Sequence, residues 1–237
     1  MALKENVLGT VRMGRDLIGE VAGRIPAEER SKSGSFETWA SKDGLAHVAE
    51  WLDVDVKRLG SDGVIEAIPE ESIEERNKAI FDKHASKSWD EVMRFVDKTF
   101  RAATDLVSRM TDADLERERE FSDGSKRPPW RMIAGHALMH TVPHLGLICS
   151  RTGLSELPTK MEEDAARVLL ELPADAEFHA TVKYNLACRY ALDGRAEDAV
   201  SLLRESLPVS DRLCAWAPKD EDLVSLRERA DFKALVD

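Results

Sequence analysis

Apolar residues recur every three or four positions along most of the chain, which is the pattern of helices that bury one face. Over residues 3–25 this pattern ends just before Pro26, a helix-breaking residue. The same spacing predicts four further helices, at residues 41–59, 73–85, 88–110 and 129–153. Alternating patterns typical of strands are nearly absent. The sequence therefore predicts an all-α fold, with its long helices arranged as an up-and-down four-helix bundle.

The chain changes character near Pro158, where a polar segment ends and alanine becomes frequent. We therefore expect two domains, a bundle over residues 1–153 and a smaller helical domain over residues 158–237.

Within the second domain, residues 184–200 are similar to one tetratricopeptide repeat. Small Ala187 and Ala199 would let two antiparallel helices approach closely, and Gly194 would form the turn of the hairpin. A single repeat cannot bury its own apolar face. We therefore expect covering helices at about residues 161–171 and 220–235.

Charge and cysteine content exclude several classes of protein. The chain has 34 Lys and Arg against 45 Asp and Glu, a net charge of −11, without a basic cluster. This composition argues against binding to nucleic acid or to an anionic membrane. The three cysteines form no Cys-x-x-Cys pair, and the N-terminus has no apolar signal core. A cytoplasmic protein is expected.

A stretch of 19 residues between Arg131 and Arg151 carries no formal charge, which is close to the length of a membrane span. The stretch contains three histidines and Pro143, and no second stretch resembles it. We therefore interpret it as a buried helix of the bundle and expect no membrane association.

The three histidines of this stretch are spaced for metal binding. His136, His140 and His144 follow one another at four-residue steps and share one helical face. His-x-x-x-His on a helix lets two imidazoles bind one ion, although Pro143 is expected to kink the helix between His140 and His144. The alternative is that Thr141 or backbone carbonyls satisfy the buried imidazoles.

A third metal ligand must come from another helix, and His47 is the leading candidate. His47 shares a face with Glu50 and Trp51, which either lines a polar cavity or meets water. The remaining histidines, His84 and His179, lie in polar sequence and are expected at the surface.

Two motifs resemble those of the DinB-like superfamily. Trp39-Ala-Ser-Lys-Asp43-Gly-Leu-Ala-His47-Val-Ala-Glu-Trp51 resembles its second-helix motif, Trp-(Ser/Thr)-x-Lys-Asp-x(2,3)-Ala-His-Leu-x-x-Trp. The stretch from Trp130 to His144 resembles the segment that carries the later histidine pair, and its sequence is most similar to that of the ClbS/DfsB group. The likeness covers about residues 1–153.

The resemblance implies a four-helix bundle with a pocket at one end, where many members hold zinc or nickel by three side chains. The matching positions here are His47, His140 and His144. Trp39 and Trp51 would wall the pocket.

By the same resemblance, Glu50, Asp43 or His136 would act as a general base or support a ligand. Glu50 and His136 are the leading catalytic candidates.

The expected function is that of a metal-dependent enzyme acting on a small molecule, either by hydrolysis or by transfer or isomerisation with a low-molecular-weight thiol. One alternative is a non-catalytic module that binds a protein partner through the tetratricopeptide-like domain. Another is a metal-free ClbS/DfsB-like hydrolase or resistance protein.

A second apolar face of the uncharged helix bears on assembly. Leu138, Val142 and Leu145 lie opposite the histidines, so this face needs its own cover. Either the C-terminal hairpin or a second copy in a homodimer is expected to supply it.

Overall fold

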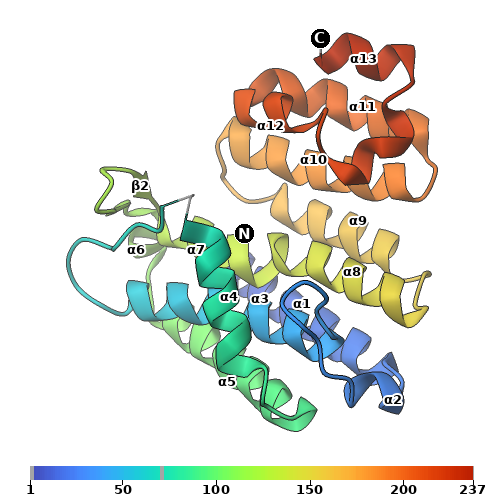
Figure 1. Ribbon diagram of the computed structural model, residues 1–237. Helices are drawn as coiled ribbons and strands as arrows, with labels where there is room; N and C mark the ends of the chain where they lie inside the picture. Colours follow the sequence, from blue (N-terminus) through green and yellow to red (C-terminus); the bar gives the residue numbers. More distant parts are fainter. Residues whose placement is uncertain (1–2, 70–71, 237) are drawn as a thin grey trace. The chain divides into compact units, whose positions relative to one another are not determined.

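The computed structural model describes residues 3–69 and 72–236. The chain divides into two compact units, Met1–Ser155 and Glu156–Asp237. We call them the bundle unit and the C-terminal unit. Figure 1 shows that both are built almost entirely of helices. The predicted all-α fold is confirmed.

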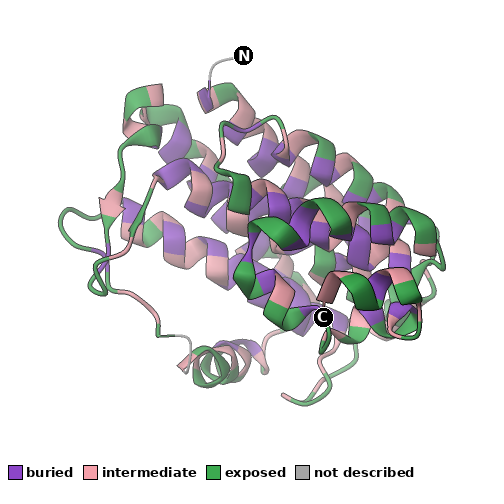
Figure 2. Ribbon diagram, turned by 90° about the horizontal axis from the view of Figure 1, so that it is seen from above, coloured by how far each residue is buried: buried purple, intermediate pink, exposed green. Residues whose placement is uncertain are grey.

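Four long helical segments form the bundle unit. They are α1 (Leu3–Arg24), α3 (Ser41–Leu59), α5 (Trp89–Arg109) and a last segment made of α7 (Pro129–Ala134), a π-helical turn (Gly135–Met139) and α8 (Thr141–Thr152). Both α1 and α3 contact α5 on one side and the last segment on the other, so the four segments enclose one core. Buried residues line their inward faces in Figure 2.

Shorter elements fill the connections of the bundle unit. They are α2 (Ala27–Arg30), α4 (Ile73–His84), α6 (Asp112–Glu116), β1 (Arg119–Glu120) and β2 (Lys126–Arg127). The two strands pair antiparallel, and Ile65 forms a bridge with Phe121 beside them. The polar region after α5 therefore contains a helical turn and a minimal hairpin.

The start of α5 is held by a capping box. The amide of Glu91 donates to Oγ of Ser88 over 3.3 Å, and the amide of Ser88 donates to Oε2 of Glu91 over 2.8 Å. Two amides that the helix leaves without partners are thereby satisfied.

Replacing Ser88 by alanine should lower the free energy of unfolding of the bundle unit by about 1 kcal/mol, because one capped amide loses its acceptor. Urea unfolding would measure the loss. Exposed Ser86 is the matched control, and an equal loss in both alanine variants would contradict the capping role.

At Gly14, α1 lies very close to the backbone of the π turn. A Cβ atom on Gly14 would stand 1.9 Å from the carbonyl oxygen of Ala137 and 3.2 Å from Cε1 of Phe100. Only glycine permits this contact, because a real Cβ atom needs more than 3 Å from such an oxygen. Gly14 therefore sets how near α1 lies to the histidine-bearing segment.

The uncharged stretch is a packed element of the bundle. Within the described residues one helix, Pro129–Thr152, is long and apolar enough to cross a membrane by length and composition, and 56% of its most apolar window is buried. Its parts contact α1 and α3. Leu138, Val142 and Leu145 are all buried; a homodimer remains a prediction.

The C-terminal unit is a series of short helices around its own core. Its α-helices are α9 (Pro158–Leu169), α10 (Ala176–Leu192), α11 (Ala196–Ser206), α12 (Asp211–Trp216) and α13 (Ala230–Val236), and 3₁₀ turns span Leu207–Val209 and Glu221–Leu226. The expectation of one helix over residues 220–235 was wrong. Asp220 accepts the amide of Asp222 and starts a 3₁₀ turn, and a break separates that turn from α13.

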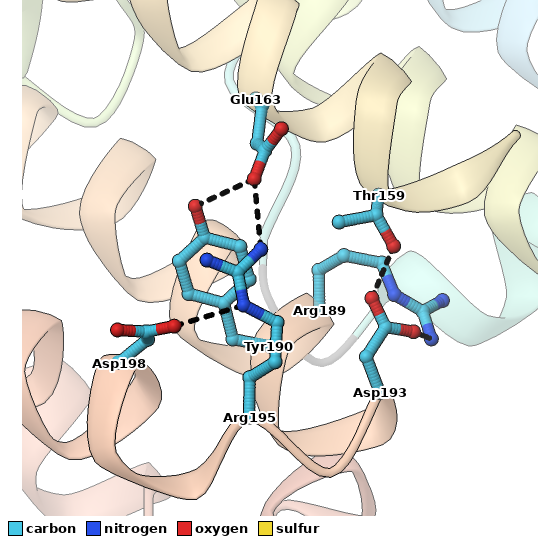
Figure 3. Close-up of polar contacts among 7 residues, drawn as sticks. All are labelled: Thr159, Glu163, Arg189, Tyr190, Asp193, Arg195 and Asp198. Carbon is cyan, nitrogen blue, oxygen red and sulfur yellow. Dashed lines mark hydrogen bonds and ion pairs between the residues drawn. The ribbon is translucent and has the colours of Figure 1, made fainter.

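The hairpin of α10 and α11 has the predicted close packing. Ala187 and Ala199 are fully buried, and Gly194 adopts a left-handed φ of 76° between the two helices. Figure 3 shows how α9 is tied to this hairpin: the carboxylate of Glu163 accepts from the Tyr190 hydroxyl and from Arg195. The resemblance to a tetratricopeptide repeat itself remains a prediction.

Candidate metal centre

Three histidines from two segments of the bundle converge at one point. His47 lies in the middle of α3 and is buried, whereas His140 at the end of the π turn and His144 on α8 are partly exposed. Nε2 of His140 lies 3.3 Å from Nε2 of His47 and 3.1 Å from Nε2 of His144. The structure therefore brings together the three histidines that the sequence singled out as candidate ligands.

The spacing of the nitrogens suits a divalent ion. Two imidazole nitrogens bound to one tetrahedral zinc ion lie about 3.3 Å apart, given zinc–nitrogen bonds of about 2.0–2.1 Å. Hydrogen bonding does not explain the cluster as well, because one ring nitrogen of a neutral imidazole can either donate once or accept once. Nε2 of His140, however, faces two other nitrogens. The donor set fits a metal centre with three protein ligands.

Electrostatics keep these imidazoles in the form that binds metal. Burial, followed by the charges of His144 and His136, lowers the pKa of His47 to about 3. Burial and then Arg151 lower the pKa of His144 to about 4, and burial lowers the pKa of His140 well below its usual range. All three are neutral near pH 7, and neutral imidazole is the metal-binding form.

The outer nitrogens of two of these histidines have little support. Nδ1 of His47 and Nδ1 of His140 are buried, and no described residue hydrogen-bonds to either. Metal-binding histidines usually donate this N–H to a carboxylate or a carbonyl. Each unpaired group costs about 1–3 kcal/mol in the folded protein. The convergence of the Nε2 atoms therefore comes at the expense of stability, as is common at functional sites.

Two tryptophans wall the histidine cluster. The ring of Trp39 lies 4.7 Å from that of His47 and stacks on His144 at 6.4 Å, measured between centroids. Trp51 stacks on His136 at 5.4 Å. The indole N–H of Trp51 donates to Oδ1 of Asn77 over 3.2 Å, which fixes the ring. Both tryptophans lie where the motif resemblance placed them.

His136 does not join the other three histidines, since it pairs with Asp55. Nδ1 of His136 lies 2.5 Å from Oδ2 of Asp55, a carboxylate that is buried on α3. The side chain of His136 is 29% exposed, and its Nε2 has no hydrogen bond to a described residue. Its ring centroid is 5.4 Å from that of His140. The pair thus presents a free imidazole nitrogen beside the cluster.

His136, which pairs with Asp55, lies within the π turn, and the two clustered histidines, His140 and His144, follow the turn. The amide of His140 donates to the carbonyl of Gly135, five residues back, over 2.8 Å. Pro143 lacks the N–H that would bond to the carbonyl of Met139, and the segment accommodates this proline with a wide turn just before it. Pro143 predicts a kink between His140 and His144, but the irregularity lies one turn earlier.

The carboxylate of Glu50 faces α4 instead of the histidine cluster. It accepts from Nζ of Lys83 at 2.5 Å and lies 2.8 Å from Nε2 of His84. Burial acts to raise its pKa, but the hydrogen bonds and charges of His84 and Lys83 outweigh burial and lower the pKa to about 2. Glu50 is therefore ionised and committed to these two partners.

Two expectations about histidine exposure were wrong. His84 is buried, with 1% of its surface exposed, because it is the partner of Glu50. His179 is half-buried in the C-terminal unit, with Nε2 3.1 Å from the carbonyl oxygen of Leu172. In both cases a polar sequence context concealed a buried partner.

The lysine and aspartate of the first motif fix the start of α3. Nζ of Lys42 donates to the carbonyls of Ala85 and Lys87, at 2.7 and 2.8 Å. Oδ2 of Asp43 accepts from the amide of Ala40 over 2.9 Å. These contacts hold α3 in place and leave Asp43, a predicted base or ligand support, engaged as a cap.

A groove beside the cluster offers room for a small molecule. It has a volume of about 210 Å³, and its lining includes Phe36, Trp39, His144, Leu147 and Arg151. His144 thus contacts both the cluster and the groove.

Asp55 and the π turn were not predicted from the sequence. Asp55 lies eight residues after His47, two turns along the same face of α3, so helical spacing carries a signal for it. The π turn has a weaker signal, a glycine eight residues before a proline in one helix.

The fold and the site define an all-helical bundle with a three-imidazole centre between two of its segments. A family model described as the DinB superfamily matches residues 12–148, more than half of the chain. The chain belongs to this superfamily. Comparison with curated proteins and with solved structures finds no match.

Proposed function

We propose that the protein is a metal-dependent enzyme that acts on a small molecule, with a divalent ion of the zinc or nickel type held by His47, His140 and His144. The observation that carries the proposal is the convergence of three neutral Nε2 atoms at distances that suit one ion. Membership of the DinB superfamily agrees with it. When bound by three protein ligands, such an ion supplies Lewis-acid chemistry at its open coordination position.

His136 is the residue that we assign to proton transfer. Asp55 fixes the ring through Nδ1, which leaves Nε2 as the acceptor on the exposed side. An imidazole oriented by a buried carboxylate is suited to take a proton from a nucleophile. If that nucleophile is water the reaction is hydrolysis; if it is a low-molecular-weight thiol, the reaction is transfer or isomerisation.

Glu50, the other predicted catalytic residue, receives a different assignment. Its low pKa and its contacts with Lys83 and His84 make it unsuited to accept a proton near neutral pH. We assign it to holding α3 against α4, which keeps His47 in position one turn away.

The groove beside His144 is the proposed entrance for the substrate. Its volume suits a compact molecule, and Phe36, Trp39 and Leu147 favour one with an apolar part. The compartment we propose is the cytoplasm, because Cys149, Cys188 and Cys214 are all free thiols.

Metal binding by the histidine cluster is the direct test. Protein purified without a histidine tag and stripped with a chelator should bind zinc or nickel and melt at a higher temperature with the ion. His140→Ala should weaken binding at this site at least about 100-fold, because one of three ligands is lost. Calorimetric titration would measure the affinity.

His179→Ala is the matched control, since His179 is a half-buried histidine outside the cluster. Equal affinities in the control and in His140→Ala, or a wild-type chain that binds neither ion, would overturn the proposed function.

A further inference from the structure

The groove beside His144 contains a charged group that the proposed function does not use, the guanidinium of Arg151. The groove is lined by the segment before α3, by the first turn of α3 and by α8. Arg151 is the only lysine or arginine among its described lining residues. His144, which also lines the groove, is neutral near pH 7 because burial lowers its pKa to about 4. Arg151 therefore supplies the positive charge of this groove.

Arg151 lies on the same face of α8 as the candidate metal ligand His144. The two residues are seven positions apart, which is close to two helical turns and about 10 Å along the helix axis. Leu147 lies between them, lines the same groove and is 50% exposed, although it is a large apolar side chain. An imidazole, an apolar side chain and a guanidinium thus follow one another along the groove.

The guanidinium of Arg151 is oriented but has donors to spare. Nη1 of Arg151 donates to the carbonyl oxygen of Trp39 over 2.9 Å, and the ring of Trp39 stacks on that of His144 with centroids 6.4 Å apart. Trp39 therefore connects the arginine to the candidate metal centre. This hydrogen bond uses one of the five N–H donors of the guanidinium, and no carboxylate of a described residue forms an ion pair with Arg151.

The one acid that lines the groove does not neutralise this arginine. Glu37 is exposed, and hydrogen bonds from its own backbone and from Ser35 lower its pKa. The carboxylate of Glu37 is therefore engaged within its own loop, and no ion pair joins it to Arg151. The guanidinium lacks a counter-charge within the groove.

We propose that Arg151 binds the anionic group of the substrate, and that the substrate is a small carboxylate with an apolar body. The inference rests on the proposed function, which makes the groove the entrance of the substrate. A guanidinium presents parallel N–H donors that match the two oxygens of a carboxylate. A single arginine suits one negative charge, whereas a phosphate would carry up to two.

The same placement sets the position of the substrate. With its carboxylate on Arg151, the apolar body would contact Leu147 and the rings of Phe36 and Trp39. Its other end would then lie beside His144, about two helical turns away along α8. Arg151 is thus a specificity-determining residue outside the three-histidine cluster.

A titration of the chelator-treated, full-length chain tests the anion site. The probe is phenylacetate, and phenylacetamide is the matched neutral probe of the same shape. Nuclear magnetic resonance of the Trp39 indole N–H would follow both. We expect phenylacetate to bind at least about tenfold more tightly, because only the carboxylate forms charged hydrogen bonds. Arg151→Gln should lower the affinity for phenylacetate to that for the amide.

Arg12→Gln is the matched control, because Arg12 is an exposed arginine on α1 outside the groove lining; it should bind phenylacetate as the wild type does. A wild-type chain that does not bind phenylacetate or that binds acid and amide equally, or undiminished binding in a folded Arg151→Gln, would overturn the anion site. The comparison of acid and amide in the wild type needs no variant, so it tests the proposal even where Arg151→Gln fails to fold.

The titration also separates this proposal from the proposed function. The chelator removes any ion to which the carboxylate could bind, so the result depends on the groove alone. A chain that binds zinc but not phenylacetate would keep the metal centre and lose the anion site. A chain that binds phenylacetate but neither zinc nor nickel would keep the anion site and lose the proposed function.

Discussion

Replacing Gly14 by alanine should destabilise the bundle unit by about 3 kcal/mol, the upper end of the usual cost of overpacking. The added Cβ would stand 1.9 Å from the carbonyl oxygen of Ala137. That oxygen is backbone, so a side-chain rotation cannot relieve the contact, and α1 must move away from the π turn. Because the π turn leads directly into His140, metal affinity at the histidine cluster should fall as well.

Gly19→Ala is the matched control on the same helix. Gly19 is exposed, and a Cβ there meets nothing within 4 Å. This change should therefore stabilise the chain by about 0.5–1 kcal/mol through helix propensity. Urea unfolding followed by tryptophan fluorescence would measure both variants. A Gly14→Ala chain as stable as the wild type would show that α1 does not lie this close to the turn.

Acid should destabilise the metal-free bundle strongly, in a pH range where most proteins change little. The three clustered histidines have folded-state pKa values below the usual 6.5, about 3 for His47 and about 4 for His144. The unfolded chain therefore binds more protons than the folded chain between these values and 6.5, and stability falls as the pH falls through this range. At pH 5, His47 alone accounts for about 2 kcal/mol.

Unfolding of chelator-treated protein between pH 7 and pH 5 would reveal this slope. His47→Gln removes one titrating group, so its slope should be shallower by about 1.4 kcal/mol per pH unit near pH 5. Identical slopes in the two chains would contradict the buried, neutral state of His47. In the C-terminal unit, the raised pKa of Glu162 has the opposite effect, because it makes that unit more stable as the pH falls. Tryptophan fluorescence reports mainly on the bundle unit, because four of the five tryptophans lie there.

Much of the bundle could be predicted from the sequence because local signals there agree with the fold. The apolar spacing, the Ser88 capping box and Pro129 at a first-turn position each mark an end or a face of a helix, and the structure places the elements accordingly. The three candidate metal ligands could also be selected, since regular spacing on one helix and a motif on another single them out.

Features that depend on contacts between distant residues could not be predicted. The polar sequence around His84 predicts a surface residue. Only the packing of α4 on α3 buries His84 against Glu50. That same contact draws the Glu50 carboxylate away from the histidines. The single helix predicted over residues 220–235 does not form, and the reason is local. The side chain of Asp220 accepts from the backbone amide of Asp222 and starts a tighter 3₁₀ turn.

The extra residue in the π turn divides the longest apolar segment into two halves that are set independently. Each residue of an α-helix rotates the chain by about 100°, so removing one residue between Gly135 and Met139 would turn everything after it by that angle relative to everything before it. His136, which pairs with Asp55 of α3, is the second residue of the turn, whereas His140 and His144 follow the turn. The turn thus lets His136, which pairs with a carboxylate, take an orientation independent of His140 and His144, which converge on His47. All three histidines nevertheless belong to one continuous stretch of chain.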